Sequence, residues 1–143
     1  MFYILINSIT KKYFQFSGRA NRKEYIVFTV FFFLLCKFLE LFVFSDLVNS
    51  DIRSMNFYEI ESYIYIALFF VLFLFIPSLS ITVRRLHDLN FNGWWLLFIY
   101  LLTMLYIIFF KQYIFLFGYI IDTPLLIFKG TSGTNKYAEE PEY

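Results

Sequence analysis

The densest polar stretch of the chain is Arg84-Arg85-Leu86-His87-Asp88, which is followed by the turn and tryptophan pair Asn92-Gly93-Trp94-Trp95. Three chemistries use such residues. An imidazole beside a carboxylate can act in general acid–base catalysis, arginines pair with carboxylates in bidentate geometry, and arginines bind phosphate headgroups. Long apolar runs flank the stretch on both sides. We therefore expect it to lie where a membrane ends and water begins.

Catalysis is the least favoured of these interpretations. Adjacent residues on a helix point about 100° apart, so Asp88 is poorly placed to orient His87. No Ser or Cys nucleophile motif and no phosphate loop accompanies them, and one Cys with one His cannot build a metal site. We therefore predict that the protein is not an enzyme and needs no metal or cofactor.

The composition favours an integral membrane protein. The 143 residues suit one domain, and they are 60% hydrophobic and 16% charged, whereas soluble domains are about 45–50% apolar and about 25% charged. The net charge of +1 gives no basic field for nucleic acid, so none is expected as a partner.

The apolar runs predict an all-α protein with about four transmembrane helices, since each run approaches the length that crosses a bilayer. Pro77 should kink the second span, and the helix should continue beyond it through Arg84 to Asp88. The last run also allows a re-entrant piece. The predicted segments are an interfacial amphipathic helix at 1–16, spans at 26–44, 63–83, 94–110 and 113–128, and a polar tail at 129–143.

Charge placement predicts the topology. The segment 45–61 carries four acidic residues and one basic residue, Arg53, whereas the other flanks of the spans are basic. The positive-inside rule therefore places both termini in the cytoplasm. The basic flanking residues are Lys11, Lys12, Arg19, Arg22, Lys23, Arg84, Arg85, Lys129 and Lys136.

Three ionisable residues fall inside the predicted spans, namely Lys37, Glu40 and Asp122. Such residues are costly in lipid and usually face a partner or a cavity. We predict that Lys37 pairs with Glu40 or Asp122. The alternative is a pathway for an ion or small solute, which would make the protein a small channel or transporter subunit.

Several motifs together resemble a known family. They are Phe16-Ser17-Gly18-Arg19, Arg22-Lys23-Glu24-Tyr25, Pro77-Ser78, Arg84-Arg85-Leu86-His87-Asp88, Gly93-Trp94-Trp95, Gly130, Gly133-Thr134-Asn135-Lys136-Tyr137 and Pro141. Over residues 12–141 the chain resembles the small bacterial inner-membrane proteins catalogued as domain of unknown function 805. The resemblance implies a multi-pass protein of the bacterial plasma (inner) membrane and brings no established activity.

The motif residues suggest a cytoplasmic polar cluster. We predict that Glu24 accepts hydrogen bonds from Arg84 or Arg85, that Asp88 accepts from Arg19 or Arg22, and that His87 is a bystander or a single donor. Ser17 or Asn21 is expected to cap the first long helix. The full cluster is Gly18, Arg19, Arg22, Glu24, Arg84, Arg85, His87, Asp88 and Asn135.

Lipid recognition is the second interpretation of the same residues. The arginines and Lys129 would meet anionic headgroups at the cytoplasmic leaflet, with Trp94 and Trp95 as interfacial anchors. We therefore expect a structural, lipid-contacting or regulatory protein. The partners we consider are membrane lipids, including anionic headgroups, and another membrane protein or a second copy of the chain.

Overall fold

The computed structural model describes residues 1–39, 41, 57–110 and 123–141. Within these ranges the regular structure is helical, as predicted, and one further helical turn covers residues 123–127. The four helices are α1 (Phe2–Ile9), α2 (Arg22–Phe38), α4 (Phe57–Asp88) and α5 (Trp94–Phe110).

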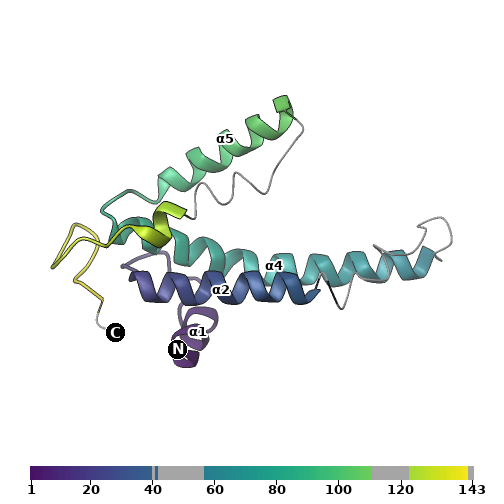
Figure 1. Cartoon of the computed structure of the whole chain (residues 1–143), viewed down its shortest axis with the longest axis horizontal. Coiled ribbons are helices and arrows are strands. Elements are labelled where there is room, and N and C mark those ends of the chain that lie inside the picture. Colours follow the sequence, from purple (N-terminus) through teal and green to yellow (C-terminus); the bar gives the residue numbers. More distant parts are fainter. Residues whose placement is uncertain (40, 42–56, 111–122, 142–143) are drawn as a thin grey trace.

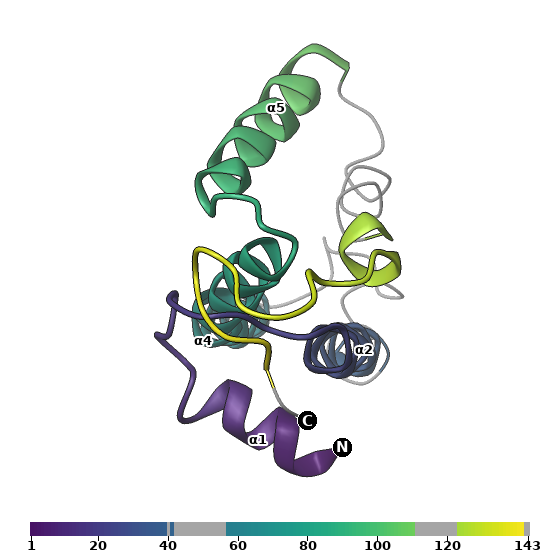
Figure 2. The same cartoon turned by 90° about the vertical axis from the view of Figure 1, so that its left-hand side faces the viewer.

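The helices gather around the C-terminal half of α4. Helix α2 runs beside α4, and α1 lies across the pair and contacts both (Figures 1 and 2). Helix α5 leaves the end of α4 and diverges from it (Figure 1). The segment 123–141 returns to the place where α2 begins and α4 ends (Figure 1). Segments far apart in the sequence therefore meet at one end of the molecule.

The N-terminal helix is shorter than predicted. It ends at Ile9, whereas the apolar spacing predicted a helix over residues 1–16. The Ser80 hydroxyl on α4 donates to the carbonyl of Lys12 at 3.0 Å and to that of Gln15 at 2.6 Å. Because these carbonyls are bound by α4, the chain after α1 follows the surface of α4 instead of continuing a helix.

Helix α2 begins at Arg22 because Asn21 caps it. The Asn21 side chain accepts a hydrogen bond from the backbone N–H of Glu24 at 2.8 Å, which satisfies one of the free donors of the first turn. Of the two cap residues that the sequence left open, Ser17 and Asn21, the structure shows Asn21. The helix ends at Phe38, so it starts before the predicted span of 26–44; residues 40 and 42–44 lie outside the described part.

Helix α4 passes through Pro77 without ending. Proline has no N–H, so the carbonyl of Phe73, four residues earlier, has no helical donor. The hydroxyl of Tyr13 donates to this carbonyl at 2.6 Å. One turn further along α4, the hydroxyl of Thr82 donates to the carbonyl of Ser78 within the helix.

The turn between α4 and α5 uses Asn90 as its left-handed residue, with φ of 64°. The N–H of Phe91 bonds the carbonyl of Leu86 at 2.9 Å, which closes the helix end as in a Schellman motif. Sequence reasoning had taken Asn92-Gly93 as the main turn signal. Gly93 is needed for space, since a Cβ there would lie 2.8 Å from Cγ1 of Val83.

Among the described residues, one helical stretch is long and apolar enough to cross a membrane, Leu68–Asp88, and Trp94–Tyr106 is a shorter apolar stretch. These correspond to the predicted second and third spans, and α5 begins at the predicted residue, Trp94. The described part of this helix ends at Phe110, and residues 111–122 lie outside it. The predicted fourth span, 113–128, is described only from residue 123 onward. The number of spans therefore stays a prediction.

Candidate functional site

Five charged side chains are buried together where α2 begins and α4 ends. Their exposed fractions are 5% or less, although each carries a formal charge at neutral pH. Buried charges are rare in proteins unless they are paired. The set consists of Arg19, Glu24, Arg84, Arg85 and Asp88. We call it the buried ion-pair network.

Glu24 joins three segments. Its carboxylate accepts from Nη1 of Arg84 on α4 at 2.7 Å and from Nζ of Lys12 in the turn after α1 at 3.1 Å. The hydroxyl of Ser8 on α1 donates to it at 3.2 Å. Nε and Nη2 of Arg84 have no hydrogen-bond partner among the described residues. Glu24 is therefore the principal counter-ion of Arg84.

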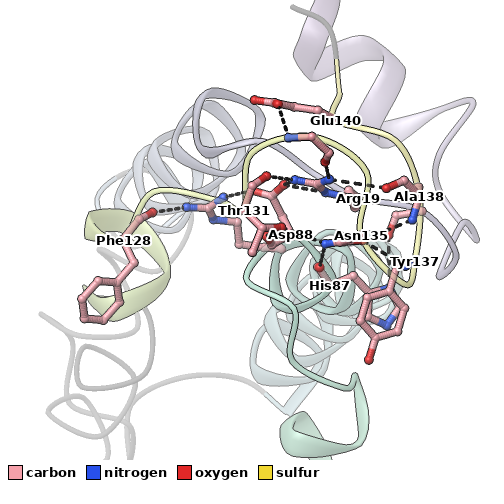
Figure 3. Close-up of polar contacts among 12 residues, drawn as sticks. Arg19, His87, Asp88, Phe128, Thr131, Asn135, Tyr137, Ala138 and Glu140 are labelled. Atoms are coloured by element: carbon pink, nitrogen blue, oxygen red, sulfur yellow. Dashed lines mark hydrogen bonds and ion pairs between the residues drawn. The ribbon is translucent and has the colours of Figure 1, made fainter.

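Asp88 is the second centre of the network (Figure 3). Its carboxylate accepts from Nε of Arg19 at 2.9 Å and also pairs with Nη1 of Arg85. Its backbone carbonyl accepts from the N–H and hydroxyl of Thr131 at 2.9 and 3.0 Å. A Cβ on Gly130 would lie 2.0 Å from Oδ2 of Asp88, so only glycine fits there.

The arginines also bind the backbone of the C-terminal segment. Arg85 donates from Nε to the carbonyl of Leu125 at 2.9 Å and from Nη2 to the carbonyl of Phe128. Arg22 donates from Nε to the carbonyl of Leu126 at 2.7 Å. The last carbonyls of a helical turn lack donors from within the helix, and these guanidinium groups donate to them. Positive charges are also favourable at helix C-termini.

Arg19 and Asn135 hold the polar tail. Arg19 donates from Nη1 to the carbonyl of Gly133 at 2.6 Å and from Nη2 to the carbonyl of Thr131 (Figure 3). The Asn135 amide donates to the carbonyl of His87 at 2.9 Å and accepts from the N–H of Tyr137 at 2.9 Å. The tail is thereby bonded to the end of α4.

His87 lies at the edge of the network. Its Nδ1 is 3.1 Å from the carbonyl oxygen of Gly18, so Nδ1 carries the proton and donates. The imidazole also stacks on the ring of Tyr137, with centroids 3.9 Å apart. Gly18 adopts φ of 84°, a conformation that glycine reaches without strain. A single donor bond is one of the two roles predicted for His87.

Both predicted kinds of ion pair are present in the structure. Glu24 with Arg84 and Asp88 with Arg19 are confirmed. Of the two arginines predicted as alternatives for Asp88, Arg19 forms the pair, whereas the guanidinium of Arg22 binds a backbone carbonyl. The sequence analysis did not predict the contact of Lys12 with Glu24, because it used Lys12 only for the topology. It also did not predict the stacking of Tyr137 on His87, although Tyr137 belongs to the tail motif.

The remaining predicted site residues lie apart from the network. Trp94 and Trp95 are exposed at the start of α5, as interfacial anchors would be. Lys37 is exposed in the last turn of α2. Glu40 and Asp122 lie outside the described residues, so the pairing of Lys37 with either acid stays a prediction. In the part of the chain that the structure describes, no three His, Cys, Asp or Glu side chains gather as a metal would require.

Comparison with known proteins finds a matching family and similar inner membrane proteins. Residues 13–139 match the family described as "Protein of unknown function (DUF805)". Inner membrane protein YhaI of Escherichia coli strain K12 is 29% identical over 136 residues, which cover 95% of this chain and 93% of that protein. YhaI of Escherichia coli O157:H7 gives the same values. No solved structure matches the chain.

The family match covers nearly all of the motifs that suggested the resemblance, and it includes every residue of the buried ion-pair network. The relatives are named as inner membrane proteins, which agrees with the membrane class predicted from composition. The chain therefore belongs to the DUF805 family.

Proposed function

We propose that the protein is a multi-pass inner-membrane protein with both termini in the cytoplasm and a structural, lipid-contacting or regulatory role. One observation carries this proposal, which is the distribution of polar and apolar side chains. Arg84 and Arg85 are at most 1% exposed, whereas Phe109 on α5 is 75% exposed and Leu72 on α4 is 61% exposed. A soluble protein places these residue types the other way round.

A lipid environment accounts for the exposed side chains. On α5 large apolar residues are exposed from Trp94 to Phe109, and on α2 Phe33 and Leu34 are exposed as well. Contiguous apolar surface of this kind marks a membrane or protein interface. Helix α4 contributes a stretch of 21 residues, Leu68–Asp88, which spans about 31 Å at about 1.5 Å per residue. A bilayer's hydrocarbon core is about 30 Å thick.

The buried ion-pair network supports a structural role. Its acids pair with arginines, Glu24 with Arg84 and Asp88 with Arg19. Arg19 and Arg85 also bind backbone carbonyls of the C-terminal segment 123–141. Near a membrane such pairs are strengthened because little water competes for them. The network thus holds the connection after α1, the end of α4 and the tail together on the side that we propose to be cytoplasmic. The inner-membrane names of the relatives support the same location.

Cysteine labelling tests this topology. Cys36 is first replaced by Ala, and single cysteines are then introduced as Ser50→Cys or Ser132→Cys. A membrane-impermeant maleimide should label Ser50→Cys in intact cells, because the acidic segment 45–61 is expected outside. It should label Ser132→Cys only after the membrane is opened. Labelling of Ser132→Cys in intact cells would overturn the proposal.

A further inference from the structure

A cavity of about 240 Å³ opens beside the buried ion-pair network, between the start of α2 and the C-terminal segment. Its volume is below the roughly 300–1,000 Å³ of pockets that enclose whole small molecules, so it suits one charged group instead. Four basic and two acidic side chains line it, which leaves a net charge of +2. They are Arg19, Arg22, Lys23, Lys129, Asp88 and Glu140.

Only part of this charge is already neutralised within the protein. Arg19 and Asp88 form an ion pair at 2.8 Å. Glu140 accepts a hydrogen bond from the backbone N–H of Gly133 at 2.7 Å, which leaves its charge in place, so three cations and one acid give the net charge of +2. Arg22, Lys23 and Lys129 remain. Each is exposed, and none pairs with an acid among the described residues. Arg22 uses Nε for the Leu126 carbonyl, so its two terminal nitrogens stay available.

These three cations suit a phosphate group. A guanidinium presents paired N–H donors that match phosphate oxygens, and an ammonium adds a compact charge with rotatable donors. The first residues of α2 are Arg22 and Lys23, so the positive end of the helix dipole adds to the same field. The cavity therefore combines shape, charge and donors for an anion.

Exposed apolar side chains directly precede Lys129 in the chain. Ile127 and Phe128, directly before Lys129, are 59% and 60% exposed. Inorganic phosphate makes no favourable contact with apolar side chains, whereas a phospholipid carries acyl chains close to its phosphate. We propose that this cavity binds the phosphate of an anionic phospholipid through Arg22, Lys23 and Lys129. This inference deepens the proposed function and rests on its membrane placement, because it names the lipid class that the protein contacts.

The test compares two double variants of the full-length protein in neutral detergent. Lys23→Gln/Lys129→Gln removes two charges from the cavity without breaking any bond described above. Lys11→Gln/Lys136→Gln removes two charges from exposed positions that do not line it. Native mass spectrometry then measures binding of phosphatidylglycerol, of phosphatidylcholine with the same acyl chains, and of inorganic phosphate.

The wild type should bind phosphatidylglycerol more tightly than phosphatidylcholine. The cavity variant should lose about fivefold in phosphatidylglycerol affinity per lysine, or about 25-fold in total, while the control variant changes by less than about twofold. Equal losses in both variants would show attraction to general surface charge and overturn the proposal, as would no loss in either.

Inorganic phosphate separates the two sources of the anion. Binding of inorganic phosphate that depends on Lys23 and Lys129, without a preference for phosphatidylglycerol, would overturn the lipid assignment. Cysteine labelling reports the topology independently. A protein with the proposed topology and no lipid preference would refute this inference alone, whereas wrong labelling would refute the membrane placement whatever the protein binds.

Discussion

Replacing Glu24 by Gln should be among the most destabilising isosteric changes in this protein. The amide keeps the shape of the carboxylate but removes the charge that Arg84 and Lys12 share. Lys12 is 19% exposed and can turn to water, whereas Arg84 is 1% exposed and cannot. Glu24→Gln therefore leaves a buried guanidinium without its counter-ion.

The magnitude follows from which partner remains. Breaking a buried ion pair by removing one member costs about 3–5 kcal/mol, so Glu24→Gln should lower the free energy of unfolding by that amount. Arg84→Met should cost less, about 1–3 kcal/mol, since Glu24 keeps Lys12 at 3.1 Å and Ser8 at 3.2 Å. It also removes two donors that have no partner among the described residues.

The double variant Glu24→Gln/Arg84→Met buries neither charge, so it should be about as stable as Arg84→Met alone. This predicts a coupling energy of about 3–5 kcal/mol between the two positions, equal to the cost of Glu24→Gln alone. Unfolding by SDS in mixed micelles gives the free energies for the cycle. Glu139→Gln is the matched control, because it removes one exposed acid and should change stability by less than about 0.5 kcal/mol.

Two results would refute this reasoning. If Glu24→Gln were no more destabilising than Glu139→Gln, Arg84 would not depend on Glu24 for its charge balance. If the two single effects simply added, the 2.7 Å contact between them would make no net contribution to stability.

Two further predictions concern backbone groups. Gly130→Ala should release the tail and speed its cleavage by protease several-fold more than Ser132→Ala does, because a Cβ at Gly130 meets Asp88 whereas Ser132 is exposed and already carries a Cβ. Equal effects would contradict this. Tyr13→Phe should lower the free energy of unfolding, measured in SDS, by about 1 kcal/mol. In a Pro77→Ala background the loss should be clearly smaller, because the Phe73 carbonyl regains a helical donor. The same loss in both backgrounds would exclude the role of the Tyr13 hydroxyl.

Several features follow from the sequence because they depend on composition or local spacing. The membrane class follows from the apolar content, and the start of α5 at Trp94 follows from the beginning of an uninterrupted run of apolar residues. The cap at Asn21 follows from the preference of a helix's first turn for a side-chain acceptor. The sequence also predicted that Glu24 pairs with an arginine at the end of α4, because few residues of opposite charge lie at the same predicted depth.

Other features depended on the tertiary structure, and most of them involve backbone carbonyls. Arg22 binds the carbonyl of Leu126 instead of Asp88, and Tyr13 binds the carbonyl that Pro77 leaves free. Every residue carries a carbonyl, so the sequence does not mark which ones lack a helical donor and lie beside a given side chain. That depends on where the helices end and which segments meet, and only the folded chain decides it.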